Sequence, residues 1–390
     1  MLKFILFFLL FNALYGPRLN ILDLMLFFNL SIFTLYIVQM FINGRIYGSK
    51  KILISLVFLL FMSCVHYLYV GLVEFTLLDL IIKTILYFLS ASFLVYWYNK
   101  IYDSDNFVIL RHILYATFLN AICVIIAFFY KPFQIFLSNV LNYEKQLNWV
   151  ETEHRIFDIS LGGGATASFT FAIVFLMGLA LPKSSRPPVF IFLMSTIAVA
   201  AALMGRTGLY FILIYVFFNL LKNILNFKYI FSYILSGFLL FVIGIYNYSK
   251  IMETEYFLWA SQGIYEENGT FNTLKKMWFL PSDNLIFGDG YFGRVFPNII
   301  YSDVGYIRVI HAIGFVGLFL LYGWLIYLLY LSKSSFRKVL NPNMKNIFTI
   351  IILMILLINF KELHFASRGT LLILFVVFLV CQEHKRKSAY

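Results

Sequence analysis

Charged residues are scarce in this chain, and their scarcity excludes a soluble protein of ordinary composition. Of the 390 residues, 12% are charged and 62% are hydrophobic. A soluble fold of this length cannot bury so much apolar side chain, whereas a bilayer solvates it. Composition therefore predicts an integral membrane protein.

Cysteine and the common cofactor motifs are also scarce. The three cysteines, Cys64, Cys123 and Cys381, lie within apolar runs, without the spacing of a disulfide framework or a zinc site. The chain lacks a phosphate-binding P-loop, a dinucleotide-binding glycine fingerprint and a metalloprotease histidine pair. We therefore expect no cofactor and no bound metal. The net charge of +12 is interpreted as a topology signal, with no nucleic-acid partner.

Long apolar runs are what the chain does contain. A spanning helix needs about twenty mostly apolar residues, because its backbone polar groups must bond within the helix. The first run resembles a signal peptide, but no small-residue cleavage site follows, so we expect it to be retained. The boundary within 189–221, around Gly205, is open to a different division. The sequence predicts an all-α polytopic membrane protein with about twelve spans, at residues 2–15, 19–41, 52–70, 75–97, 107–130, 162–181, 189–204, 207–221, 229–247, 305–330, 346–360 and 368–381.

Basic residues indicate how these spans are oriented. An even number of spans puts both termini on one side, and that side holds more Lys and Arg although its loops are much shorter. Short cytoplasmic loops are enriched in basic residues, so both termini are predicted to be cytoplasmic. Asp79 and Lys83, four residues apart on one span, are predicted to neutralise each other. Asp23, near the outer end of the second span, is either structural or cavity-lining.

This orientation divides the chain into three parts. Residues 1–247 hold spans one to nine and an outer loop at 131–161, and residues 248–304 form one large periplasmic loop. Residues 305–390 hold the last three spans and a basic cytoplasmic tail. Within the large loop, 270–279 is predicted to form a short amphipathic helix on the membrane surface. We expect the chemistry of the protein at this loop.

Arg206 is the first candidate functional residue. It stands between two apolar runs, in Gly205-Arg206-Thr207-Gly208. One interpretation is an interfacial arginine that snorkels to lipid headgroups. The other is an anion clamp, because small neighbours let a phosphate approach a guanidinium that does not deprotonate.

A second cluster ends the large loop, where the glycine-rich residues 287–294 precede Ser302 and Asp303. Asp303 is either the cap of the next helix, with Ser302 as an alternative cap, or a functional carboxylate. Arg308 either reaches back to the outer interface or faces a polar cavity. His311 shares its helix face, although a lone histidine in a span is more often a packed residue. Secondary candidates on the last outer loop are Glu362, His364 and Arg368.

With these motifs, the chain resembles the Wzy family of O-antigen and capsule repeat-unit polymerases, which are relatives of the O-antigen ligases. The resemblance rests on about a dozen spans with both termini inside, and on one large outer loop before the last three spans. At the level of motifs it covers only about 200–210 and 285–317. The matching motifs are Gly205-Arg206-Thr207-Gly208, Leu285-Ile286-Phe287-Gly288-Asp289-Gly290, Ser302-Asp303-Val304-Gly305-Tyr306, and Gly314 with Gly317.

The resemblance implies a glycosyltransferase of the bacterial inner membrane that polymerises undecaprenyl-pyrophosphate-linked oligosaccharide units at the outer face. The growing chain leaves its lipid and joins the sugar of a new lipid-linked unit. A cation stabilises the departing pyrophosphate, and a base takes the proton of the attacking hydroxyl. Membrane lipid is a partner, and a chain-length regulator protein is a further partner compatible with this reaction. The alternatives are an O-antigen ligase and, in another class, a flippase or transporter of lipid-linked sugars.

Matching positions carry the family's roles onto this chain. Arg206 corresponds to the family's arginine at that span end, where it would hold pyrophosphate. Asp303 lies where related ligases carry a histidine, which weighs against a ligase and leaves Asp303 as a base or an acceptor-positioning group. The candidate substrate-binding residues are Arg294, Arg308, Tyr291, Tyr306 and His311, with Trp278 as another aromatic residue for stacking on sugars.

Overall fold

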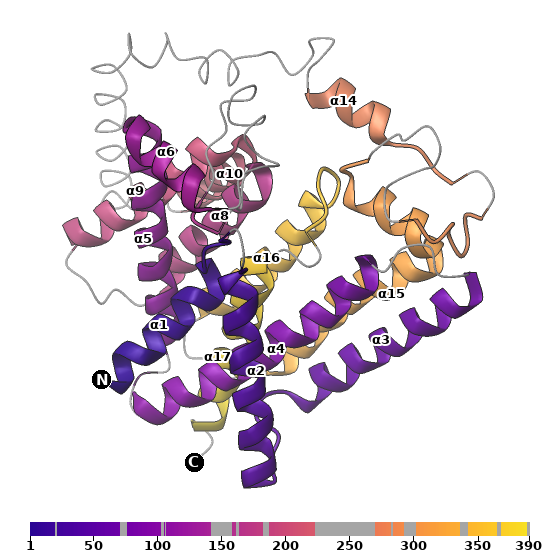
Figure 1. Cartoon of the computed structure of the whole chain (residues 1–390), viewed down its shortest axis with the longest axis horizontal. Helices are drawn as coiled ribbons and strands as arrows, with labels where there is room; N and C mark the ends of the chain where they lie inside the picture. Colours follow the sequence, from indigo (N-terminus) through magenta and orange to yellow (C-terminus); the bar gives the residue numbers. More distant parts are fainter. Residues whose placement is uncertain are drawn as a thin grey trace. The chain divides into compact units, whose positions relative to one another are not determined.

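Helices make up nearly all the regular structure in the computed structural model of the chain (Figure 1). In the part of the chain that the structure describes, the only β-structure is two isolated antiparallel bridges, between Arg18 and Asp23 and between Leu19 and Leu141. The described residues are 1–19, 22–70, 76–102, 105, 107–141, 158–160, 164–181, 187–222, 270–281, 284–291, 302–335, 342–364 and 368–387.

Five of the described helices are long and apolar enough to cross a membrane, as expected for an α-helical membrane protein. Each coincides with a predicted span. Phe41 and Leu68 are more than three-quarters exposed on two of them, which suits a surface that faces lipid. The five helices are α2 (Leu24–Asn43), α3 (Lys50–Val70), α4 (Thr76–Ile101), α5 (Val108–Phe129) and α15 (Gly305–Ser335).

Shorter apolar helices coincide with six more of the predicted spans. The shortest has 14 residues, which is about 21 Å of helix against roughly 30 Å of hydrocarbon. The twelve-span count and the cytoplasmic termini therefore stay predictions, and the span at 229–247 lies outside the described residues. The six helices are α1 (Leu2–Tyr15), α8 (Gly164–Ala180), α9 (Pro187–Met204), α10 (Arg206–Lys222), α16 (Pro342–Ile358) and α17 (Arg368–Lys387).

The structure tests two local expectations and adds one helix. The division within 189–221 is confirmed, because α9 ends at Met204 and α10 begins after the non-helical Gly205. The predicted amphipathic helix is present as α14 (Thr270–Met277). Helix α6 (Lys131–Val140) was not predicted; its proline falls in the first turn, where a missing N–H costs nothing. Residues 142–157 and 161 of the loop 131–161, and residues 248–269, 282–283 and 292–301 of the large loop, lie outside the described part.

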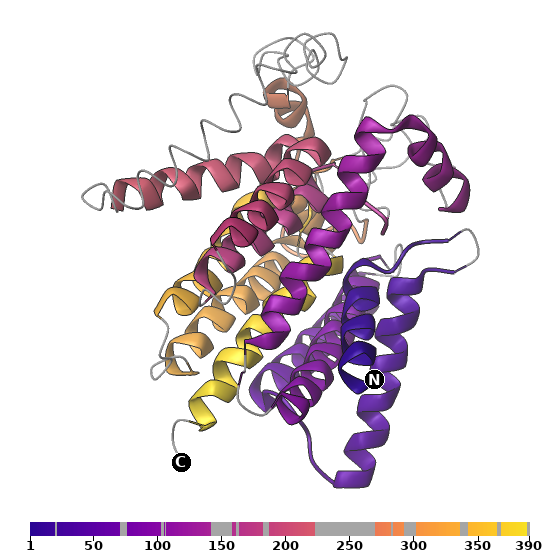
Figure 2. The ribbon, with the colours of Figure 1, turned by 90° about the vertical axis from the view of Figure 1, so that its left-hand side faces the viewer.

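The chain forms two compact units, and the division between them falls within α5. The first unit combines Met1–Gly16, Leu24–Ile113 and Thr270–Tyr390. Helix α17 lies at its centre and packs against α1, α4, α15 and α16 (Figure 2). Every side chain from Leu371 to Cys381 is at most 2% exposed, which explains why this helix is apolar on all sides.

A few buried polar side chains connect the helices of the first unit. The Asn29 amide on α2 donates to the carbonyl of Ala13 at 2.9 Å, and Ser90 on α4 donates to the carbonyl of Asn29 at 3.2 Å. Hydrogen bonds of this kind hold helices together where lipid supplies no hydrophobic drive for association. Asn29 therefore joins α1, α2 and α4.

The second unit comprises Pro17–Asp23 and Leu114–Gly269, and in it α8, α9 and α10 pack against one another. Asp158, just before α8, is buried and accepts a hydrogen bond of 3.0 Å from the Asn120 amide on α5. Asn120 in turn accepts from the N–H of Ile159 at 3.3 Å. These bonds attach the end of the loop 131–161 to the side of α5.

Candidate functional site

Helix α15 is broken at Ile313 and Gly314. Ile313 has φ −136° and ψ 15°, and Gly314 has φ 63° and ψ −168°, so neither residue is helical. The positive φ favours glycine, because a Cβ in this conformation meets the following carbonyl. The break separates a first segment of α15, which carries Tyr306, Arg308 and His311, from a longer second segment.

The end of the large loop fills this break. The N–H groups of Phe315 and Val316 donate to the carbonyls of Leu285 and Ile286 at 3.1 and 3.2 Å, in place of partners within α15. The carbonyl of His311 accepts from the N–H of Asp289 at 2.7 Å. Non-helical backbone at membrane depth is stable only where protein satisfies its polar groups. We call residues Asn284–Asp289 the inserted segment.

Two glycines allow this close approach. A Cβ at Gly288, where φ is 76°, would lie 2.5 Å from the backbone nitrogen of Gly314. A Cβ at Gly314 would overlap the carbonyl oxygen of Ile286. The glycines that sequence analysis assigned separately to a turn and to a span are therefore two sides of one backbone contact.

His311 joins the first segment of α15 to the loop. Its side chain is 3% exposed, and Nε2 lies 3.2 Å from the carbonyl oxygen of Phe279. Nδ1 lies 3.5 Å from Oδ2 of Asp289, whose side chain is 29% exposed. His311 is thus a packed residue with a carboxylate beside it. Asp289 was not among the residues predicted from the sequence to be functional, although it follows Gly288 directly.

The hydrogen bonds at the start of α15 show whether Asp303 or Ser302 caps this helix. The first helical bond runs from the N–H of Arg308 to the carbonyl of Val304 at 3.0 Å, so Asp303 stands one residue before the capping position. Asp303 is half-buried and makes no side-chain hydrogen bond within the described part of the chain. The Ser302 hydroxyl donates to the carbonyl of Met277 at 2.9 Å and does not cap α15. Both capping interpretations are therefore wrong.

Asn359, at the end of α16, holds the first turn of α15. Its side-chain oxygen accepts from the Tyr322 hydroxyl and from the N–H of His364, both at 3.0 Å. A Cβ on Gly305 would collide with this side chain, so α15 approaches α16 through a glycine. Tyr306 donates its hydroxyl to the carbonyl of Leu356 at 2.7 Å, and its ring contacts Tyr322. The contacts of Tyr306 thus join α15 to α16.

An apolar cavity of about 190 Å³ lies beside the break. It is bounded by α3, by α15 from Ile313 to Leu320, and by Phe287 of the inserted segment. Its polar lining consists of Ser63, His66 and Tyr69. The inserted segment therefore borders this apolar space through Phe287.

Arg206 belongs to the second unit, as the first residue of α10. The turn that precedes it is held by Ser168 of α8, whose Oγ lies 2.6 Å from the carbonyl oxygen of Gly205 and accepts from the N–H of Gly208 at 2.9 Å. A Cβ on Gly208 would overlap the backbone of Ser168. The small residues around Arg206 therefore permit close helix packing, which sequence analysis had interpreted only as access for a phosphate.

The remaining candidates are placed as follows. Arg308, Tyr291 and Glu362 are half-buried, and His364 is buried behind Asn359. Trp278 is 45% exposed and stacks on Phe360. Arg294 and the side chains of Arg206 and Arg368 lie outside the described residues.

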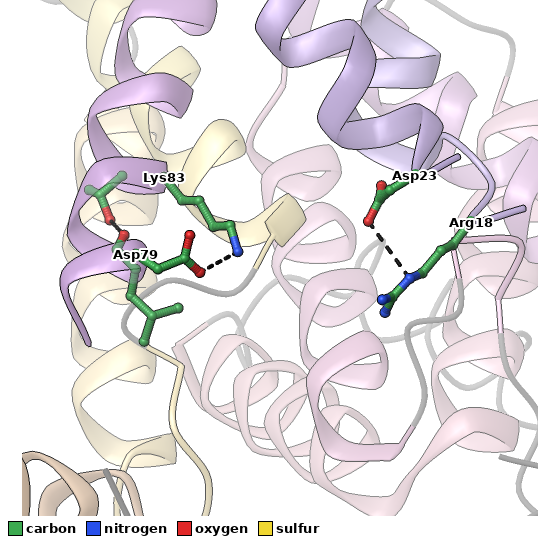
Figure 3. A network of polar contacts seen from close by, with 6 residues as sticks. Arg18, Asp23, Asp79 and Lys83 are labelled. Carbon is green, nitrogen blue, oxygen red and sulfur yellow. Dashed lines mark hydrogen bonds and ion pairs between the residues drawn. The ribbon is translucent and has the colours of Figure 1, made fainter. Parts of the chain in front are cut away.

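Two ion pairs belong to spans or span ends (Figure 3). Lys83 donates to the carboxylate of Asp79 on α4, which confirms the predicted neutralisation. Nε of Arg18 and Oδ2 of Asp23 lie 4.0 Å apart in the second unit, where the two residues also share a backbone bridge, which favours the structural interpretation of Asp23. Among the described residues, no group of three or more His, Cys, Asp or Glu side chains is placed to hold a metal ion.

Comparison with known proteins gives no match to this chain among protein-family models, curated proteins or solved structures.

Proposed function

We propose that the chain is a membrane glycosyltransferase that polymerises undecaprenyl-pyrophosphate-linked oligosaccharide repeat units at the outer face of the inner membrane. The insertion of the large loop into α15 is the observation that supports this function best. It places Asp289 beside the buried His311, and it places Phe287 of the same segment in the wall of an apolar cavity. A substrate with a polar sugar-pyrophosphate head and a lipid tail needs polar groups beside an apolar wall.

The proposed roles follow the chemistry of glycosyl transfer. Arg206 holds the pyrophosphate, with Arg294 or Arg308 as a second cation that stabilises the departing charge. Asp303 acts as a base or positions the acceptor sugar, and its lack of a capping role supports a function for the carboxylate. Tyr291 and Trp278 remain candidates for stacking on sugars. The contacts of Tyr306 with α16 favour a structural role for that residue.

A flippase or transporter of the same lipid-linked sugars is the second candidate, and the broken α15 favours it. Transporters often bind substrate at the free ends of discontinuous helices. In this chain, backbone groups of the inserted segment bond N–H groups of Phe315 and Val316 and the carbonyl of His311. Because the loop already uses these helix ends, the polymerase remains the better supported proposal.

Deletion of the gene in its native host tests the proposal, with the banding pattern of the surface polysaccharide as readout. Loss of a polymerase leaves surface glycans that carry a single repeat unit, because export and attachment continue. Loss of a flippase or a ligase leaves no attached repeat. Single-repeat glycans, restored to long chains by the wild-type gene, support the proposal, and the absence of any attached repeat rejects it.

A further inference from the structure

We propose that Asp289 is the general base of this transfer and that His311 positions it. This inference rests on the proposed function, and it separates the two roles left open for Asp303. Asp289 would take the proton from the acceptor hydroxyl, while Asp303 positions the acceptor sugar. Three features of the structure carry the assignment: the backbone bond of Asp289, the surroundings of the His311 ring, and the partial exposure of the carboxylate.

The backbone of Asp289 is held by the break in α15. In an unbroken helix the carbonyl of His311 would accept the N–H of Phe315, but Phe315 donates to Leu285. The released carbonyl accepts the N–H of Asp289 at 2.7 Å. The carboxylate is therefore attached to a buried helix, about 9 Å along the axis from Gly305, although it belongs to a loop.

The His311 ring lies between two oxygen acceptors. Nε2 is hydrogen-bonded to the carbonyl oxygen of Phe279 at 3.2 Å, and Nδ1 lies 3.5 Å from Oδ2 of Asp289, which is an ion-pair distance. The buried Nδ1 makes no hydrogen bond within the described residues, and the Asp289 carboxylate lies within ion-pair distance of it. With Nε2 engaged by backbone and the side chain 3% exposed, His311 itself is not available as a base.

Asp289 has the exposure that a base requires. Its side chain is 29% exposed, so the carboxylate is reachable while Oδ2 faces the histidine. A base must come within hydrogen-bonding distance of the proton that it removes, and a fixed carboxylate does so with little reorganisation. Asp303, by contrast, has no hydrogen-bonded partner among the described residues that would orient it.

The step balances without a further reactant. The acceptor hydroxyl oxygen bonds to the anomeric carbon of the donor chain, and the bond from that carbon to the pyrophosphate oxygen breaks. The electron pair leaves with the pyrophosphate, and the hydroxyl proton passes to Asp289. The proton is then released to water.

Asp289→Asn tests the base directly in the deletion host. Asparagine keeps the shape and the backbone N–H to His311, so the fold persists while the proton acceptor is lost. We expect polymer per copy of membrane protein to fall at least ~100-fold, the usual range for a general base. Asp105→Asn is the matched control, because it likewise removes a carboxylate that lies beside a basic side chain, that of Arg111, while asparagine can keep the bond of 2.9 Å from the N–H of Phe107.

Two variants of His311 separate positioning from packing. In His311→Asn the side-chain amide lies where Nδ1 lay, so a polar group stays beside the Asp289 carboxylate. In His311→Gln the amide reaches the position of Nε2 and can still donate to Phe279. If His311 positions Asp289, the asparagine variant makes more polymer per copy than the glutamine variant. The reverse order means that His311 only anchors Phe279 and overturns its positioning role.

The outcomes distinguish this assignment from the proposed function. If the deletion host attaches no repeat unit, both fall together. If the deletion host shows single-repeat glycans and Asp289→Asn restores wild-type polymer per copy, the function stands and the assignment of Asp289 falls. If Asp289→Asn only folds poorly, its abundance and its polymer fall in proportion. Polymer per copy of protein then stays constant, and this result also rejects Asp289 as the general base. Loss of polymer per copy in Asp289→Asn but not in Asp105→Asn supports it.

Discussion

At the residue scale, Asp303 is a carboxylate that the sequence offers as a helix cap and that the backbone of α15 shows not to be one. An aspartate two residues before a helix start is an ordinary cap in sequence. The first helical bond goes to Val304, however, and no side-chain hydrogen bond of Asp303 exists within the described residues. The sequence identified the residue, but it did not determine whether the helix begins at that residue or after it.

Asp303→Asn is therefore expected to change function and leave stability nearly unchanged. With no cap to lose, the free energy of unfolding should change by less than about 0.5 kcal/mol. Loss of a charge-assisted contact to the acceptor sugar, worth about 1.5–3 kcal/mol, should lower polymer roughly 10- to 100-fold. Polymer banding together with membrane abundance measures both effects.

Ser302→Ala is the neighbouring comparison for Asp303→Asn. It removes the hydrogen bond to Met277 and should cost about 1 kcal/mol of stability without removing a charge. Wild-type banding from Asp303→Asn at normal abundance contradicts the role of the Asp303 carboxylate.

Arg206 is expected to be sensitive even to lysine. Ser168 bonds the backbone of Gly205 and Gly208, so substitution of the Arg206 side chain leaves these bonds intact. Lysine snorkels as well as arginine but lacks the planar fork that binds a phosphate through two N–H groups. We expect Arg206→Lys to impair polymerisation and Arg206→Ala to abolish it, both at unchanged abundance. Long polymer from the alanine variant shows that Arg206 is only an anchor.

At the scale of the element, α15 is where sequence and structure differ most. Hydrophobicity predicted an uninterrupted span at 305–330, because a break of two residues does not change the apolar character of the run. The sequence contains Gly314, Gly317 and Gly323 in the same helix, and it does not indicate which of them lies at the break. Only the contact with the inserted segment identifies Gly314. A Cβ at Gly314 overlaps backbone, whereas one at Gly323 meets nothing within 4 Å.

This difference makes Gly314→Ala and Gly323→Ala a matched pair. Alanine at Gly314 must adopt φ 63°, at a cost of about 1–2 kcal/mol, and it also displaces Ile286. Alanine at Gly323 lies in open space within a regular helix and should stabilise it by up to about 1 kcal/mol. We expect lower thermal stability and loss of polymer for Gly314→Ala only. Equal behaviour of the two variants means that the inserted segment is not held by this contact.

At the scale of the whole molecule, the sequence predicted the class of protein and most helices but not their assembly. Apolar runs and the excess of Lys and Arg in cytoplasmic loops are properties of the linear sequence, so both can be counted without knowing which residues contact one another. The inserted segment, the partnership of Asp289 with His311 and the support of the Arg206 turn by Ser168 connect residues distant in sequence. Nothing in the local pattern encodes those connections. The compact units do not follow the linear order either, since the first unit takes in both ends of the chain.

Reporter fusions test the predicted topology, and one pair of positions does so most sharply. Between Lys222 and Thr270 the sequence predicts a single crossing, at 229–247, where the structure describes no residue. Between Thr270 and Lys338 the crossing is α15, one of the five helices long enough to span. We expect fusions near Lys222 and Lys338 to report the cytoplasm, and fusions near Thr270 and Glu151 to report the periplasm. If Thr270 reports the cytoplasm together with Lys222, then 229–247 does not cross, and the start of α15 with Asp289 and Asp303 faces the cytoplasm. Lipid-linked units that await polymerisation at the outer face could not reach those carboxylates, so this single result would exclude the proposed reaction.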